Sequence, residues 1–99
     1  MQPEECQTMA DLRVAIDALD GRLIELLAQR AAYVERAIVL KPHEGIPAAA
    51  PDRVREVLAK VRERAVASGL SPDLAETIWG EMIRFFIARE EEVLGRDEP

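Results

Sequence analysis

The N-terminal part of the chain repeats apolar residues at alternating spacings of four and three positions. This heptad-like repeat predicts one long helix over about residues 8–41, an interval that lies between two prolines and contains none. Thr8 can cap the first turn of this helix, with Asp11 three residues later as its partner. The stripe comprises Leu12, Ile16, Leu19, Leu23, Leu26, Arg30, Tyr33 and Ala37.

A run rich in proline and alanine at residues 42–50 predicts a loop after the long helix. A second helix is expected over about residues 51–67 and a third over about 72–94, because each begins with a proline and ends before a glycine. Ser71 can cap the first turn of the third helix. The apolar residues are mostly Leu, Ile, Val and Ala, a mixture that suits helix packing. The 99 residues are therefore expected to form a single all-α domain over residues 1–99.

The predicted first helix is too long for a compact monomer of this size. Its ~34 residues would span roughly 50 Å at about 1.5 Å per residue, whereas a compact chain of this length is roughly 35 Å across. Two shorter helices cannot easily cover so long a stripe, so we expect a second copy of the chain to cover it. An extended monomeric hairpin, or a kink at Gly21, is the alternative.

The chain is acidic, with a formal net charge of −6. Negative charge repels nucleic acids and anionic membranes, so neither is an expected partner. Cys6 and His43 are the only residues of their types, which excludes an intrachain disulfide and argues against cysteine-rich or histidine-paired metal sites. There is no long apolar run and no signal-peptide pattern, so a soluble cytoplasmic protein is expected.

Two charged residues occupy positions that the helical pattern assigns to the interior. Arg30 and Glu90 each have only apolar or aromatic residues three and four positions away along the chain. Arg36 has such neighbours too, but its long side chain could lie along an apolar surface with its charge in water. A buried charge is costly unless it has a partner or a ligand. The pattern leaves two interpretations open, a core ion pair between Arg30 and Glu90 or a binding site for a charged ligand.

The spacing of three basic residues restricts how they could share a site. Lys41 follows Arg30 by 11 residues, close to three helical turns, so the two lie on one face about 16 Å apart along the axis. Arg13 precedes Arg30 by 17 residues, which is roughly 25 Å along a straight helix. No metabolite-sized ligand bridges that distance, so Arg13 could join the same site only from a partner chain.

Taken together, the charged positions and their separations resemble the all-helical chorismate mutases. Protomers of that family are three helices woven into a homodimer, and the resemblance covers nearly the whole chain. It is carried by residues 12–20, 28–30, Lys41, residues 52–53 and Glu90. The resemblance implies an intertwined homodimer and an enzyme that needs no metal or cofactor.

The resemblance also implies a role for each charged residue. Arg30 and Arg53 of one subunit, together with Arg13 of the partner subunit, would hold the two carboxylates of the substrate. Planar guanidinium groups suit this role because they pair bidentately with carboxylates. Lys41 would donate to the ether oxygen, where negative charge develops as the carbon–oxygen bond breaks. Glu90 would be the second donor to that oxygen.

This chain departs from the typical mutase pattern at the position of Glu90. Glutamine is commonest there, although some members have glutamate. A glutamate can donate only while it carries a proton, so the resemblance implies a protonated Glu90 among its apolar neighbours and an activity that falls as pH rises.

The residues that would surround the substrate ring also depart from the typical mutases. Acids that hold the ring hydroxyl are replaced by Ala50 and Val54, and Phe86 replaces a small polar residue in the pocket. These changes resemble a sister branch, the isochorismate pyruvate lyases, which form salicylate and pyruvate.

Three functions remain open at this point. We rank chorismate mutase, which forms prephenate, first and isochorismate pyruvate lyase second. The third is a non-catalytic helical dimer that binds a partner or an aromatic metabolite. Whether the loop at residues 42–50 closes over the pocket is also left open.

Overall fold

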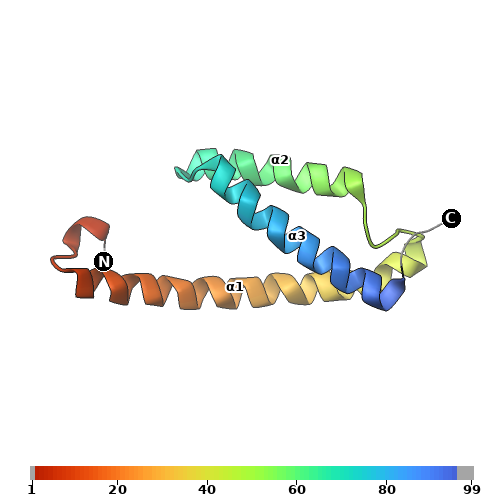
Figure 1. Ribbon diagram of the computed structural model, residues 1–99, viewed down its shortest axis with the longest axis horizontal. Coiled ribbons are helices and arrows are strands. Elements are labelled where there is room, and N and C mark those ends of the chain that lie inside the picture. Colours follow the sequence, from red (N-terminus) through yellow and green to blue (C-terminus); the bar gives the residue numbers. More distant parts are fainter. Residues whose placement is uncertain (1, 96–99) are drawn as a thin grey trace. The chain divides into compact units, whose positions relative to one another are not determined.

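The computed structural model describes residues 2–95, and within that range it contains helices and no strand (Figure 1). A short 3-10 helix, η1, covers Pro3–Glu5. Three α-helices follow: α1 over Met9–Glu44, α2 over Pro51–Ser68 and α3 over Pro72–Leu94. The prediction of an all-α chain with one long N-terminal helix is confirmed.

Side chains at the predicted positions cap the first turns of α1 and α3. The Asp11 amide donates to Thr8 Oγ1 at 3.1 Å, and Asp11 Oδ2 in turn accepts from the Gln7 amide at 3.1 Å. At α3, the Leu74 amide donates to Ser71 Oγ at 3.2 Å. Each cap satisfies a backbone donor that the helix itself leaves unpaired, so these sequence signals fix where the two helices begin.

The prediction that α1 ends before Pro42 is wrong, because the helix continues to Glu44 with Pro42 inside it. Proline removes one helical hydrogen bond, but here it lies in the last turn, where few such bonds remain to be lost. The helix then ends in a Schellman motif. The Ile46 amide donates to the Lys41 carbonyl at 2.9 Å, and Gly45 adopts a left-handed φ of 68°.

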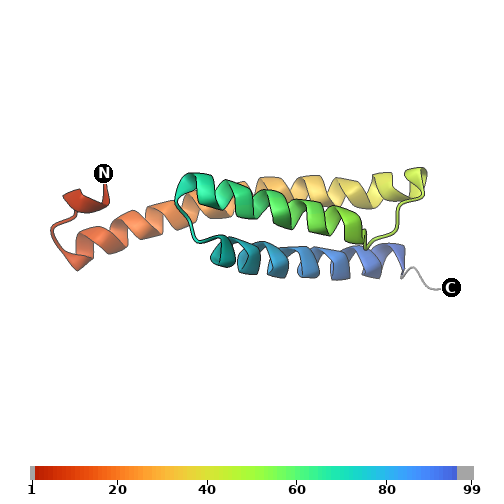
Figure 2. The ribbon, with the colours of Figure 1, turned by 90° about the horizontal axis from the view of Figure 1, so that it is seen from above.

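Contacts within the chain divide it into two units, Met1–Val34 and Glu35–Pro99. In the second unit α2 packs against α3. The two helices run beside each other in Figure 2, and in Figure 1 they are closest at the turn that joins them and diverge toward their other ends. Val61, Ala65 and Ala75 form the buried core of this pair, and Val57 and Trp79 pack against it. The two alanines let the helices approach closely, and the partly buried Trp79 covers one side of this core.

The first unit is formed mainly by the N-terminal part of α1, and its apolar stripe is exposed. The exposed fractions of Ile16, Leu19, Leu23 and Leu26 lie between 47% and 59%. Side chains this large and this regularly spaced are seldom left in water by a stable protein.

Gly21 lies within α1, where a glycine is unfavourable for helix formation. A Cβ built there meets no atom within 4 Å. We expect Gly21→Ala to raise the free energy of unfolding by about 1 kcal/mol, measured by urea denaturation. Gly45→Ala is the matched control and should lower stability, because an alanine is strained at the positive φ of Gly45. A destabilised Gly21→Ala protein would contradict the expectation and indicate a second chain close to this position.

No helix within residues 2–95 combines the length and the apolar character that crossing a membrane requires.

Candidate active site

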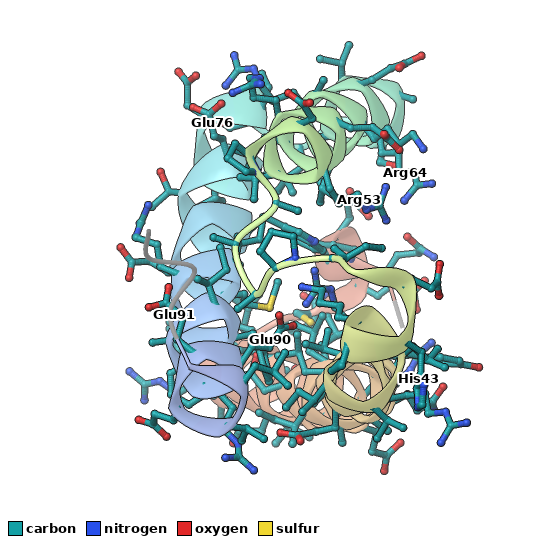
Figure 3. The ribbon with its side chains drawn as sticks, turned by 90° about the vertical axis from the view of Figure 1, so that its right-hand side faces the viewer. His43, Arg53, Arg64, Glu76, Glu90 and Glu91 are labelled. Carbon is teal, nitrogen blue, oxygen red and sulfur yellow. The ribbon has the colours of Figure 1, made fainter. Side chains whose placement is uncertain are left out.

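A buried ion pair joins the last turns of α1 to the C-terminal part of α3. Lys41 Nζ donates to Glu90 Oε2 at 2.5 Å, and the two side chains are 19% and 6% exposed, respectively. Figure 3 shows Glu90 pointing into the space between α3 and the end of α1, whereas His43 and Glu91 point outward. The predicted burial of Glu90 is confirmed, and its partner within the second unit is Lys41.

The Lys41 ammonium has a second acceptor in the loop that follows α1. It donates to the backbone carbonyl of Ala48 at 2.8 Å, and Ala48 itself is 4% exposed. A lysine ammonium carries three protons that can be donated. Two are therefore used by Glu90 and Ala48, which leaves one for a molecule bound beside the pair.

A second ion pair holds the same two helices together next to the buried one. Arg89 Nε donates to Glu35 Oε1 at 3.2 Å, with both side chains close to half exposed. An exposed pair of this kind contributes about 0–1 kcal/mol. Together the two ion pairs fix the register of α1 against α3, because Glu35 and Lys41 of α1 pair with the adjacent residues Arg89 and Glu90 of α3.

Arg53 lies in the first turn of α2 with its side chain 62% exposed. Its guanidinium donates to Glu56 Oε1 at 2.7 Å, and Lys60 Nζ donates to the same oxygen at 3.0 Å. The hydrogen bond and charge of Lys60, followed by the charge of Arg53, lower the pKa of Glu56. Because the ion pair between Arg53 and Glu56 is exposed and weak, a carboxylate on a ligand could replace Glu56 as the partner of Arg53 with little loss of free energy.

The remaining predicted site residues differ in their surroundings. Val54 and Phe86 are half-buried in the second unit, and the Phe86 ring meets the edge of Phe85 with centroids 5.2 Å apart. Arg13 is exposed and Arg30 is half-buried in the first unit. Of the predicted residues, the structure thus brings Lys41 and Glu90 into direct contact, while the roles of the arginines stay predictions.

Ala48 is the site residue that the sequence did not single out. It contributes a backbone carbonyl, which every residue has, so no residue type marks it. The only available signal was its place in a short segment between Pro47 and Pro51, which limits the conformations of the loop.

Among residues 2–95, no three His, Cys, Asp or Glu side chains are grouped so that they could hold a metal ion.

Comparison with known proteins places these residues in a family context. The family model described as chorismate mutase type II matches residues 12–91. The chain is 35% identical over 89 residues to the isochorismate pyruvate lyase of Pseudomonas aeruginosa, an alignment that covers 89% of this chain and 86% of that protein. It is 36% identical over 84 residues to the T-protein of Haemophilus influenzae, and 37% identical over 73 residues to that of Enterobacter agglomerans. These alignments cover 85% and 74% of this chain but only 22% and 20% of the T-proteins, so the chain spans about a fifth of their length.

Proposed function

The chain belongs to the chorismate mutase type II family, and we propose that it breaks the ether carbon–oxygen bond of a chorismate-type dicarboxylate. The observation that carries this proposal is the Lys41 ammonium, which is largely buried and held beside Glu90. A fixed cation in a partly desolvated site stabilises negative charge that develops on a nearby oxygen far better than a cation in water does. Lys41 would supply that cation to the ether oxygen of the substrate.

Three arginines are the proposed ligands of the two carboxylates. Arg53 is exposed at the start of α2 and paired only weakly, so its guanidinium is available to a substrate carboxylate. Arg30 of the same subunit and Arg13 of the partner subunit would complete the set. Holding both carboxylates selects one compact conformer of the substrate, which removes much of the entropic cost of the reaction.

The active form is proposed to be an intertwined homodimer. The support is the stripe on α1, in which Ile16, Leu19, Leu23 and Leu26 are exposed. Burying a side chain of this size contributes roughly 1.5–3 kcal/mol, so pairing two such stripes would stabilise a dimer strongly. A dimer is also what the distance between Arg13 and Arg30 requires for both to reach one substrate.

Isochorismate pyruvate lyase is the first candidate for the exact activity. It is favoured by the likeness to the Pseudomonas aeruginosa lyase over nearly the full length of both chains. It is also favoured by the apolar residues Ala50 and Val54 at positions where mutases carry acids for the ring hydroxyl. The ether bond would break, a ring hydrogen would pass to the methylene carbon of the leaving group, and salicylate and pyruvate would result.

Chorismate mutase, which the sequence ranked first, is the second candidate. The description of the matching family model favours it. Glu90 also favours it, because glutamine is expected at this position in the lyase branch. Assays of the purified protein on both substrates test the proposal. Pyruvate release from isochorismate would support the lyase and prephenate formation from chorismate the mutase, whereas turnover of neither would contradict the proposed function and favour a binding role.

The pH dependence of the reaction tests the proposed role of Glu90. In the substrate-free protein Glu90 accepts from Lys41, so it can donate to the ether oxygen only in a complex in which it has taken up a proton. The activity of the wild-type enzyme should therefore fall as the pH rises. Glu90→Gln provides a permanent donor of nearly the same shape and should remove this part of the pH dependence of kcat. A Glu90→Gln variant with an unchanged pH profile would contradict the role.

Ala50 offers a test of what separates the two activities. It is the N-cap residue of α2 and provides no side-chain hydrogen bond to the helix. Ala50→Asp should stabilise the protein by about 1 kcal/mol through capping and raise prephenate formation relative to pyruvate release. Ala50→Asn is the matched control, because it caps the helix without adding charge and should leave that ratio unchanged. Equal ratios for both variants would contradict a role for the acid in the choice of reaction.

A further inference from the structure

We infer that the backbone carbonyl of Ala48 is a positioning group that fixes the Lys41 ammonium for catalysis. The inference rests on the proposed function, in which Lys41 donates to the ether oxygen. It adds a group to the site that comes from the loop between α1 and α2. The group belongs to the backbone, so its effect does not depend on any functional side chain.

The geometry of the ammonium carries the argument. Nζ of Lys41 lies 2.5 Å from Glu90 Oε2 and 2.8 Å from the Ala48 carbonyl oxygen. With Glu90 as the only acceptor, two protons would remain unused, and the flexible lysine side chain could still shift Nζ and Cε about that one hydrogen bond. The Ala48 carbonyl accepts one of these two protons and restrains the position of Nζ, so a single proton remains, in the direction set by the tetrahedral geometry of the nitrogen. The Ala48 carbonyl therefore aims the free proton.

The surroundings of Ala48 make this carbonyl a suitable fixed point. The residue is 4% exposed, so its methyl group is enclosed and anchors this part of the loop. Pro47 precedes it directly, and the proline ring limits the backbone on that side. Ala49, the next residue, is exposed. Ala48 is thus anchored in the structure, whereas its neighbour Ala49 is not.

This role predicts an effect on kcat rather than on KM. Substrate binding depends mainly on the arginines, which a change at Ala48 leaves intact. The chemical step depends on the direction of the Lys41 proton, which such a change disturbs. A residue that acted only on stability would lower the amount of folded enzyme without changing kcat per folded active site.

The first experiment compares Ala48→Leu with Ala49→Leu. The larger side chain at the enclosed position should displace the carbonyl and lower kcat about tenfold, with KM changed less than about twofold. The same substitution at the exposed Ala49 should leave both constants unchanged. Equal kcat values for the two variants would overturn the inference.

The second experiment keeps every side chain and weakens the acceptor; it also replaces the Ala49 N–H by an oxygen. Replacing the peptide bond between Ala48 and Ala49 by an ester, through chemical ligation, makes the Ala48 carbonyl a poorer acceptor. We expect kcat to fall about fivefold with KM unchanged. This variant keeps the inference testable if Ala48→Leu does not fold, and an unchanged kcat would overturn it.

A third measurement does not depend on turnover. In the substrate-free protein the Lys41 ammonium should give a resolved nitrogen–proton NMR signal with slow proton exchange, and the ester should shift that signal and speed the exchange. An unchanged signal would overturn the inference. If the wild-type protein turned over neither substrate, the proposed function and the catalytic part of the inference would fail. A shifted Lys41 signal in the same samples would still support Ala48 as the group that holds the ammonium.

Discussion

An equimolar mixture of the Arg13→Ala and Arg30→Ala variants, unfolded and refolded together, should recover about a quarter of the wild-type activity, although each variant alone is inactive. In the proposed homodimer each site takes Arg30 from one subunit and Arg13 from the other. A mixed dimer therefore has one site with both arginines and one site with neither. Random pairing makes about half of the dimers mixed, and half of the sites in those dimers are intact.

The control for this experiment mixes two variants whose residues come from the same subunit. Arg30 and Arg53 are both proposed to serve the site of their own protomer, so each site of an Arg30→Ala and Arg53→Ala mixed dimer lacks one arginine. This mixture should recover no activity. Recovery in both mixtures, or in neither, would contradict the proposal that Arg13 crosses between subunits.

Lys41→Met should reduce both catalysis and stability. We expect kcat to fall by about 10²–10³, the usual effect of removing one donor to a developing oxyanion. We also expect unfolding to cost about 3–5 kcal/mol less, because the 6% exposed side chain of Glu90 loses its counter-charge. Steady-state kinetics and urea denaturation of the same preparation measure the two effects.

A double variant separates these two effects. In Lys41→Met/Glu90→Leu both charges are replaced by apolar groups of similar length, and replacing a whole buried pair is often neutral or stabilising. Most of the lost stability should therefore return while kcat stays low. If activity returned together with stability, Lys41 would have only a structural role and the proposed mechanism would be wrong.

The sequence predicted the local features of the fold and missed those that depend on long-range contacts. Thr8 and Ser71 marked where α1 and α3 begin, because a cap acts on the next few residues. Pro42 marked the end of α1 too early, because one missing hydrogen bond in the last turn does not stop the helix from continuing for two more residues. The Schellman motif at Gly45 decided the actual end.

The candidate site divides in the same way. The burial of Glu90 followed from its neighbours along α3, which the sequence displays directly. Its partner could not follow from such neighbours, because Lys41 is 49 residues away and the pairing depends on the register of α1 against α3. The family resemblance did connect the two, since both were assigned to the same substrate oxygen. The Ala48 carbonyl could be found only from coordinates.

Lys41 is hydrogen-bonded to the loop through both its backbone and its side chain, and this has a consequence for local unfolding. Its backbone carbonyl accepts from the Ile46 amide at 2.9 Å, while its ammonium donates to the Ala48 carbonyl. The loop cannot detach from α1 without exposing the Ile46 amide to solvent deuterium. Hydrogen exchange at this single amide therefore reports the free energy of opening the site, separately from that of unfolding the helices.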